Sequence, residues 1–551
     1  MESRAYPDLV GIRSRGHSSG FLWVGASSTL PHTFPAGART SGRIVIDSQR
    51  SNVRKRLSAA PLAQLALSCL MVCGPAGLSA AWAGDAGGTY TAQPSGQSSS
   101  GQSSSSPPSL PIYLHQLTDI GGLRTQLEKQ GLTFTFSYFG DTFYNPLGGV
   151  KQGPGYDGRF GVIMDGDLEK LVGWSGGKVH ASVHSIFGSL YSTNNLDNLM
   201  LVSNIEATPT VRLFNLWFEQ NLTSKISLKL GQFTAAQEFI VSKNADLFMN
   251  STFGWPMLNT QNLPSGGPNY PEAGLGARLQ VTFNDQFLMR AAIFDGDPAG
   301  SGSNNPISTD KYGVAFRVND PPFMIAEMVF GYGGARLIGA QQNPNQEGNG
   351  LPAADEEGPR LATKPTDLPG VIKVGAWYNA GTFPLQDFTQ SGVLPPQVRG
   401  DAAVYGVFEQ TLWRMPGSPN RALGFVARGV AAPSDRSEFD RYVDTGLTFR
   451  GALAWRPDDV VGLAFAYGHI SPAAAADDRA LAAQLGIPIP IRDYEAALEL
   501  TYRYEIAEDW AIQPDIQYIF HPGSNIANPA NQNLTPIPNA WVLGVRTALE
   551  F

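Results

Sequence analysis

The chain has 551 residues, of which 42% are hydrophobic and only 16% are charged. A soluble globular protein carries roughly a quarter charged residues, so this deficit predicts that much of the surface does not face bulk water. The net charge of -8 is spread along the chain without a block of lysine and arginine, which argues against nucleic acid as a partner.

Residues 1–83 are predicted to be a leader that ends in a signal peptide. A basic Arg54-Lys55-Arg56 precedes an apolar stretch over residues 62–82, and small residues before Gly84 suit a cleavage site. Removal of the leader would take both cysteines with it. A lipoprotein signal ending at Cys73 is the alternative, although the three residues before that cysteine fit its small-residue requirement poorly.

Two short segments follow the leader. Residues 84–110 consist mainly of Gly, Ser, Gln and Thr, which bury too little apolar area to fold and predict a flexible linker. Within residues 111–130, Leu117, Ile120, Leu123 and Leu127 recur at helical spacing. This spacing predicts one short amphipathic helix.

From residue 131 to residue 551 the apolar residues recur with a period of two. Leu132, Phe134, Phe136 and Tyr138 alternate with Thr133, Thr135 and Ser137, and the chain ends with Trp541, Leu543, Val545, Thr547, Leu549 and Phe551 on one face and Val542, Gly544, Arg546, Ala548 and Glu550 on the other. Such segments predict β-strands with one apolar and one polar face.

The connections between these strands alternate between short and long, with short ones near residues 172–178, 222–225 and 284–286, and long ones at 189–210 and 233–273. A soluble sandwich has no reason for that asymmetry, whereas outer-membrane barrels have short periplasmic turns and long extracellular loops. We therefore predict an all-β fold, a transmembrane antiparallel up-and-down β-barrel over residues 131–551 in a Gram-negative outer membrane, with residues 111–130 as a periplasmic helix. Aromatic residues near strand ends are expected to form the interfacial girdles: Tyr138, Tyr144, Trp174, Trp217, Trp413, Trp455, Trp510, Tyr518 and Trp541.

Both termini of such a barrel lie in the periplasm, so the number of strands must be even. The alternation of upward and downward strands is consistent from both ends but fails over residues 310–369. Either residues 314–332 hold one strand instead of two, or a further strand lies near residues 336–341. We predict sixteen strands, with eighteen as the alternative.

Several motifs resemble the carbohydrate-selective porin family of Gram-negative outer membranes. They are residues 121–124 (GGLR), 156–159 (YDGR), 165–171 (DGDLEKL), 202–207 (VSNIEA), 212–220 (RLFNLWFEQ), 252–256 (TFGWP), 263–268 (LPSGGP), 294–298 (FDGDP) and 513–523 (QPDIQYIFHPG). The resemblance implies a sixteen-stranded barrel that admits monosaccharides such as glucose by passive diffusion. The long leader, the Ser-rich linker and an insertion at residues 341–369 depart from the pattern and leave the choice of substrate open.

Residues 234–273 are too long for a turn, and we expect them to fold into the lumen as a constriction loop, because a sixteen-stranded barrel is otherwise wide. The alternative is an extracellular lid. Residues 235–239 are compatible with a helix, and Phe253, Trp255 and Asn259 supply aromatic and amide groups of the kind that contact a sugar.

Strand alternation also places charged side chains toward the lumen, namely Arg159, Asp165, Asp167, Glu169, Glu219, Lys229, Arg278, Arg290, Arg428 and Arg503. The candidate pore-lining contacts to substrate are Arg159, Asp165, Glu219, Lys229, Arg278 and Arg290, together with Phe253, Trp255 and Asn259. Lys229, Arg278 and Arg290 lie near mid-strand and are the strongest of these. For each residue, the alternative is a solvated lumen side chain without a ligand contact.

No metal site, cofactor or catalytic residue is predicted. His180 and His184 lie about 13 Å apart along one strand, too far to share an ion. Asp295-Gly296-Asp297 suits a solvated turn better than a calcium site. His469-Ile470-Ser471 would suit a barrel hydrolase only with an orienting acid, and the sequence places none.

The competing functions are a general diffusion porin without sugar preference, an energy-coupled receptor and a barrel enzyme. The receptor is disfavoured because the segment between Gly84 and Gly131 is too short for a plug domain. The expected partners are small sugars, outer-membrane lipid and lipopolysaccharide, and the assembly machinery that reads a C-terminal strand ending in Phe551. A monomer and a homotrimer both remain open.

Overall fold

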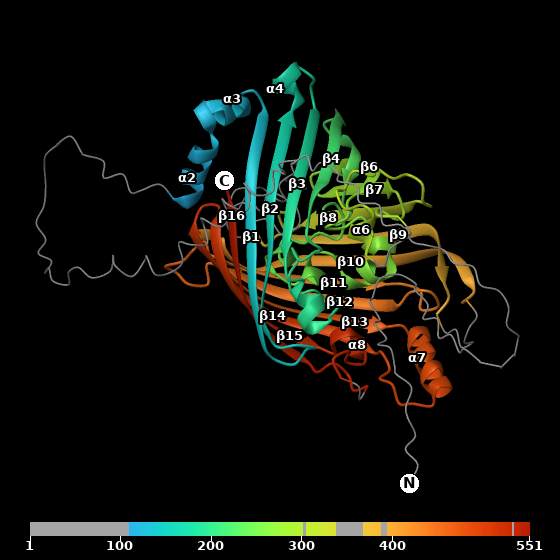
Figure 1. Ribbon diagram of the computed structural model, residues 1–551. Helices are drawn as coiled ribbons and strands as arrows, with labels where there is room; N and C mark the ends of the chain where they lie inside the picture. Colours follow the sequence, from blue (N-terminus) through green and yellow to red (C-terminus); the bar gives the residue numbers. More distant parts are fainter. Residues whose placement is uncertain (1–108, 301–304, 338–366, 387–393, 532–533) are drawn as a thin grey trace, which may run out of the picture. The chain divides into compact units, whose positions relative to one another are not determined.

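The described residues form sixteen antiparallel strands that pair in sequence order, and the last strand pairs with the first to close a barrel (Figure 1). The computed structural model describes residues 109–300, 305–337, 367–386, 394–531 and 534–551. The predicted leader and almost all of the predicted linker lie outside these ranges. The alternative of eighteen strands is wrong for the described barrel, because the closed ladder leaves no position for two more.

The strands are β1 (Leu132–Leu147), β2 (Gly153–Asp167), β3 (Gly177–Gly188), β4 (Thr210–Thr223), β5 (Ile226–Phe233), β6 (Gly274–Asn284), β7 (Phe287–Phe294), β8 (Phe323–Tyr332), β9 (Gly370–Pro384), β10 (Gln397–Met415), β11 (Ser418–Ala431), β12 (Phe439–Arg450), β13 (Val460–Ile470), β14 (Tyr494–Ala507), β15 (Trp510–Phe520) and β16 (Ala540–Glu550). The α-helices are α2 (Leu110–Thr118), α3 (Leu123–Lys129), α4 (Leu168–Val172), α5 (Met257–Asn262), α6 (Pro306–Thr309), α7 (Pro472–Leu485) and α8 (Pro522–Asn525). Short helical turns are η2 (Ile120–Gly122), η3 (Ser192–Leu196), η4 (Ala245–Leu247), η5 (Ser251–Phe253) and η6 (Pro264–Gly266). Within the described ranges, no helix combines the length and the apolar character that a membrane crossing requires.

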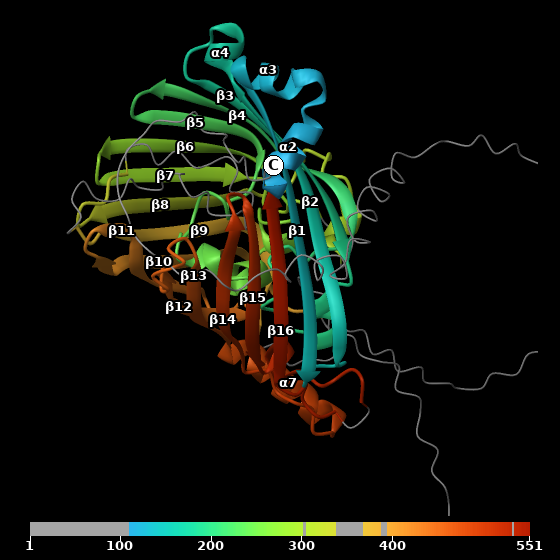
Figure 2. The ribbon, with the colours of Figure 1, turned by 90° about the vertical axis from the view of Figure 1, so that its left-hand side faces the viewer.

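The two-residue period divides each strand between two environments. On β16, Trp541, Leu543 and Val545 are 44–47% exposed, whereas the intervening Val542 and Arg546 are 0% and 4% exposed. The exposed side chains form an apolar outer belt, and the buried ones point into the interior. Because β1 and β16 pair from Ser137 to Leu147, the ladder has no open edge on which backbone groups would remain unpaired in lipid (Figure 2).

Among the described residues of the ambiguous region, 310–337 and 367–369, there is a single strand, β8, in agreement with the first of the two alternatives. Residues 314–318 alternate like a strand but do not join the ladder. The chain just before them lies against β4, where the Leu213 amide donates to the Tyr312 carbonyl at 2.9 Å and the Thr210 hydroxyl donates to the Lys311 carbonyl at 2.7 Å. Of the predicted alternative near residues 336–341, only Arg336 and Leu337 are described, and neither is in a strand.

Outward-facing aromatic rings gather at both ends of the barrel. Trp413 meets Phe449 at 5.9 Å between ring centres at the end where β16 finishes, which we call the terminal end. Tyr518 meets Trp541 at 4.7 Å at the opposite end, which we call the loop end. Trp217 was wrongly predicted to belong to a girdle: a bulge in β4 turns it inward, where it is 8% exposed and stacks on His180 at 4.8 Å.

The segment before the barrel differs from the single predicted helix. Gly121 and Gly122 adopt left-handed conformations, with φ of 65° and 74°, and separate α2 from α3. Leu117, Ile120 and Leu123 are exposed instead of packed. α3 lies at the start of β1, where the Arg124 guanidinium sits 5.3 Å from the centre of the Phe136 ring.

A buried ion pair joins the two strands that close the barrel. Arg546 of β16 donates through Nε and Nη2 to the two carboxylate oxygens of Asp141 on β1, at 2.7 Å each. Arg546 also donates to Asn204 at 2.6 Å, and Ser203 donates to Asp141 at 2.6 Å. Residues far apart in the sequence therefore converge at the seam.

Replacing Arg546 with glutamine leaves the Asp141 charge buried without its partner. We expect this variant to lose about 3–5 kcal/mol of stability. The temperature at which the folded band disappears from unheated detergent gels measures the change. The double variant Asp141→Asn/Arg546→Gln is the control and should lose less, since no charge is stranded; equal losses would refute the role of the pair.

Candidate functional site

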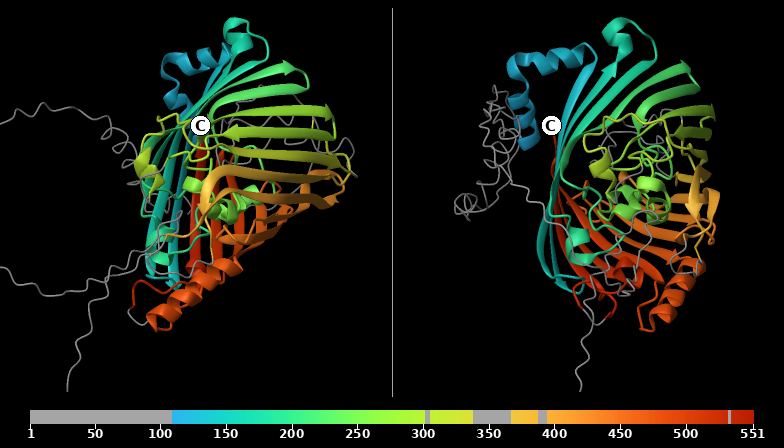
Figure 3. Two further views of the ribbon diagram at one scale, coloured as in Figure 1. Left: turned by 90° about the vertical axis from the view of Figure 1, so that its right-hand side faces the viewer. Right: turned by 45° about the vertical axis from the view of Figure 1, so that its right-hand side comes forward.

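Residues 234–273, which we call the inner segment, run from β5 to β6 through the interior of the barrel (Figure 3). All residues of the inner segment are described, and its one α-helix is α5. Residues 235–239 form a turn in which the amides of Glu238 and Phe239 donate to the Ala235 carbonyl. The helix-compatible composition of residues 235–239 is therefore not realised as a helix.

Glu238 is the anchor at the beginning of the inner segment. Its carboxylate accepts a hydrogen bond from Lys229 of β5 at 2.6 Å and one from Arg278 of β6 at 3.2 Å. Its carbonyl accepts from Arg290 of β7 at 2.8 Å. Burial would raise the pKa of Glu238, but the charges of these three basic residues outweigh it and hold the pKa at about 2.

Glu219 of β4 completes this charge cluster. Its carboxylate lies 2.9 Å from Arg278 and 3.8 Å from Lys229, whose ammonium also sits 4.0 Å from the centre of the Trp217 ring. The structure thus brings together Glu219, Lys229, Arg278 and Arg290, four residues predicted from strand alternation. Each basic group faces an acidic one, so the cluster presents paired charges.

The opposite wall holds the rest of the inner segment by its backbone. Glu499 of β14 accepts from the Met249 amide at 2.6 Å and from the Asn250 amide at 3.0 Å. Gln513 of β15 donates to the Leu247 carbonyl at 2.8 Å, and Arg428 of β11 donates to the Phe253 carbonyl at 2.6 Å. Lumen-facing side chains thus take the place of a regular hydrogen-bond ladder for this irregular segment.

A second long connection, residues 189–209, also folds inward. Glu495 of β14 accepts from the amides of Leu199 and Met200 at 2.9 and 2.6 Å. The two inward connections touch each other, because Asn250 donates to the Met200 carbonyl at 2.9 Å. The interior is therefore narrowed from two sides.

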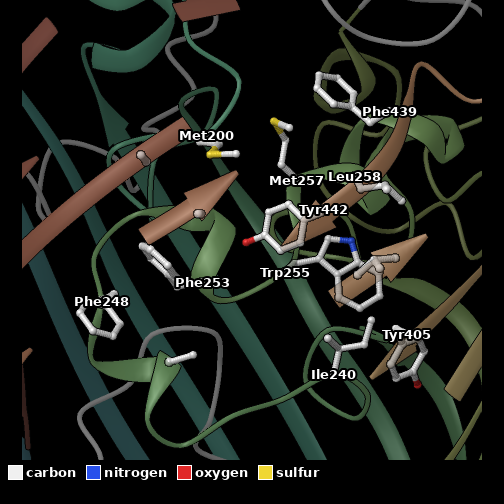
Figure 4. Close-up of a cluster of buried hydrophobic side chains, with 14 of the residues drawn as sticks. Met200, Ile240, Phe248, Phe253, Trp255, Met257, Leu258, Tyr405, Phe439 and Tyr442 are labelled. Atoms are coloured by element: carbon white, nitrogen blue, oxygen red, sulfur yellow. The ribbon is translucent and has the colours of Figure 1, made fainter. Parts of the chain in front are cut away.

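Three buried polar atoms of this region have no hydrogen-bond partner among the described residues: Trp255 Nε1, Asn259 Nδ2 and Glu327 Oε1. Asn259 already uses its oxygen to accept from Trp377 Nε1 at 2.9 Å. Trp377 of β9 pairs with Ile325 of β8, and Glu327 is two residues further along β8. The pairing thus places Asn259, which bonds Trp377, against the same part of the wall as Glu327. Figure 4 shows Trp255 in one buried cluster with Tyr405 of β10 and Tyr442 of β12.

The remaining predicted contacts lie elsewhere. Phe253 is buried in the inner segment, as Trp255 and Asn259 are. Arg159 of β2 lies over the Phe139 ring at 4.8 Å and the Tyr270 ring at 5.6 Å, apart from the cluster of Glu219. Asp165, near the terminal end of β2, lies 2.8 Å from His180.

Two predicted lumen charges are placed differently by the structure. Asp167 caps α4 by accepting from the amides of Glu169 and Lys170, and Glu169 is exposed on that helix. Glu169 does not face the lumen, because the strand period ends where the capped helix begins. Arg428 and Arg503 are buried and face inward as predicted.

The sequence features that suggested other chemistry are accounted for locally. His184 stacks on Phe214 at 4.6 Å, and no cluster of three or more metal-ligating side chains occurs in the described ranges. Asp295 accepts from the amides of Asp297 and Asp320, which closes a turn. His469 does have an acid, Asp440, at 2.8 Å, but the Ser471 hydroxyl is buried and accepts from the Ala474 amide as the cap of α7.

Sequence reasoning missed Glu238, Glu327, Glu499 and Trp377. Glu499 and Glu327 occupy polar positions within alternating segments, so the same rule that placed Arg278 could have placed them. No periodicity marks Glu238 itself, because its contacts depend on how an irregular segment crosses the lumen.

A closed barrel with an apolar outer belt, a polar interior and inward-folded connections defines an outer-membrane porin. Residues 151–551 match the family model described as carbohydrate-selective porin, OprB family, and the chain belongs to this family.

Known relatives agree over most of their length. The chain is 22% identical to Porin B of Pseudomonas aeruginosa, covering 79% of this chain and 91% of that protein. It is 21% identical to a putative porin, QuiX, of Acinetobacter baylyi, covering 79% and 92%. The high-pH structure of Pseudomonas putida OprB superposes with a TM-score of 0.65 at 20% identity, covering 79% of this chain and 97% of that one, which supports the fold.

Replacing Glu238 with glutamine removes the carboxylate that pairs with Lys229 and Arg278 and keeps the backbone carbonyl that accepts from Arg290. We expect the variant to lose about 3 kcal/mol or more of folding stability. We also expect the lumen to become more anion-selective, which the reversal potential of single channels in a salt gradient measures. The exposed Glu508, replaced in the same way, is the control; equal reversal potentials in both variants would contradict the assignment.

The pKa of Glu238 is lowered from its ordinary 4.5 to about 2. In the unmodified chain, the stability that this anchor contributes should therefore be fully present above pH 4.5 and be lost only as the pH falls toward 2.

Proposed function

We propose that this outer-membrane porin passes small neutral sugars such as glucose into the periplasm by passive diffusion, with the inner segment as its constriction. The observation that carries the proposal is a set of three buried polar atoms without a hydrogen-bond partner among the described residues: Trp255 Nε1, Asn259 Nδ2 and Glu327 Oε1, the last of which lies 3.9 Å from Arg290 Nη1. A channel, and no enzyme, is the function that the family and this arrangement favour.

The chemistry of these atoms suits a sugar. A hydroxyl group both donates and accepts hydrogen bonds, and the site offers two N–H donors and one carboxylate acceptor. Trp255 adds aromatic surface, as does Tyr405, whose hydroxyl donates to Glu327 Oε2 at 3.3 Å, and such surface suits the C–H face of a pyranose. A buried polar atom without a hydrogen-bond partner is costly, and because these three atoms are closed to solvent, the proposal requires the inner segment to move aside so that a passing hydroxyl reaches and satisfies them.

The charged lining is proposed to act differently. Glu219, Glu238 and Glu327 together neutralise Lys229, Arg278 and Arg290. Arg159 and Asp165 are each engaged with neighbouring side chains. A lining of paired charges orients hydroxyl groups without attracting one sign of ion. This favours neutral sugars over ionic solutes.

We further propose that the chain is exported by its N-terminal signal and inserted by machinery that reads its last strand. The Phe551 amide donates to the Phe136 carbonyl and the Phe136 amide donates to the Phe551 carbonyl, each at 2.9 Å, and the two rings stack at 5.6 Å. The terminal aromatic residue thus takes part in closing the barrel. Both a monomer and a homotrimer are compatible with this proposal.

A general diffusion porin is the alternative. Liposome swelling separates the two, since a sugar-selective lumen should admit glucose faster than amino acids or ions of similar size. Charged solutes entering as readily as glucose would favour the general porin.

Replacing Trp255 with phenylalanine keeps the ring and removes the N–H donor. The loss of one neutral hydrogen bond, about 0.5–1.5 kcal/mol, should raise the glucose concentration that half-blocks the ion current by roughly twofold to tenfold. Planar bilayer recordings with titrated glucose measure it. Trp541→Phe on the outer face is the matched control, and an unchanged half-blocking concentration in the Trp255 variant would remove this residue from the site.

A further inference from the structure

The outer wall of the barrel carries an apolar groove of about 930 Å³ over strands β5–β11. Alanines line its floor: Ala291, Ala326 and Ala376 stand directly opposite one another on β7, β8 and β9. Larger side chains flank this row, with Ile293 and Met324 on one side and Met289 and Met328 on the other. The groove is therefore a hollow in an otherwise large-residue belt.

Small residues extend the hollow beyond the alanine row. Val404 and Ala431 continue it on β10 and β11, and Gly406 pairs with Gly429 one step further along the same strands. A Cβ atom at either glycine would meet no heavy atom closer than 3.8 Å. No side chain of the described residues fills this space.

The groove lies toward the loop end of the wall. Its lining includes Tyr378 and reaches Ala432 and Pro433, which follow the end of β11. Because the termini of an outer-membrane barrel lie in the periplasm, the loop end faces the outer leaflet. The groove is continuous with the lipid-facing belt, and an empty apolar hollow would forfeit contacts that a hydrocarbon chain restores.

Two arginines lie at or beyond the loop end of the groove: Arg441, directly opposite the lining residue Ala431, and Arg399, three residues along β10 from the lining residue Ala402. Arg399 of β10 is exposed and forms no ion pair with any residue in the described ranges. Arg441 of β12 is directly opposite Ala431, and its side chain is 62% exposed, although it also lies 3.3 Å from Asp440. Arg436, paired with Asp435 at 2.8 Å, donates to the carbonyl of Gly400, the residue after Arg399, at 3.0 Å.

We propose that this groove binds a phosphorylated, acylated glycolipid of the outer leaflet, lipopolysaccharide, with one acyl chain on the alanine row and a phosphate at Arg399 and Arg441. The apolar floor matches the chain, and arginine is the side chain best suited to a phosphate at an interface. A second copy of this chain or an ordinary phospholipid would fit the floor but would not require the two arginines. The proposal is independent of what passes through the lumen.

Native mass spectrometry of the full chain in detergent, titrated with diphosphoryl lipid A or with phosphatidylcholine, tests it. The unmodified barrel should retain one lipid A in preference to phosphatidylcholine. Ala326→Phe fills the floor and should lower lipid A retention about tenfold. Arg399→Ser should lower lipid A retention several-fold without changing that of phosphatidylcholine.

Two matched variants serve as controls. Ala181→Phe changes an outward alanine on β3, opposite Met164 and Leu216, and Arg414→Ser changes an arginine at the terminal end of β10. Both should retain lipid A as the unmodified chain does, and glucose block should be unchanged in every variant. Equal lipid A retention in the Ala326 and Ala181 variants, equal binding of the two lipids, or a dimer that Ala326→Phe abolishes would each overturn the proposal.

Discussion

The wall of this barrel depends on one constraint: successive side chains of a strand face either lipid or the lumen, and neither environment accepts an unpaired charge or an unpaired backbone group. Closure between β1 and β16 satisfies the backbone. The lumen charges are satisfied partly by one another across the wall, as Arg546 is by Asp141, and partly by chain that is not part of the wall. Glu238, and the backbone amides that Glu499 accepts, belong to the inner segment, so the polar interior and the narrowing of the pore arise together.

This constraint explains what the sequence reveals about the fold. The period of two identifies β1 and β16 and the faces of their side chains without knowledge of any contact, and the even strand number follows from the position of the termini. The period of two predicts wrongly where an alternating segment does not join the sheet or where a bulge shifts the register. Residues 314–318 alternate but stay outside the ladder, and Trp217 turns inward because a bulge shifts the register of β4.

The site was predictable to the extent that it is built on strands. Glu219, Lys229, Arg278 and Arg290 face inward because alternation places them there, and they converge because β4 to β7 are neighbours. The prediction that Glu169 faces the lumen is wrong because Asp167 caps a helix at that point and the strand ends there. The partners of Trp255 and Asn259 could not be predicted, since Trp377 and Asn259 meet across 118 residues of sequence through an irregular path.

The way the inner segment is held limits how it can be exchanged. Its backbone is bonded by side chains from β8 at Ile240, from β9 at Val241, from β11 at Phe253 and from β14 at Met249. A graft of this loop alone into a barrel whose wall lacks those side chains would leave the backbone groups without acceptors and donors. Solute preference in this architecture is thus inherited as a matched set of loop and wall, and redesigning it calls for altering both at once.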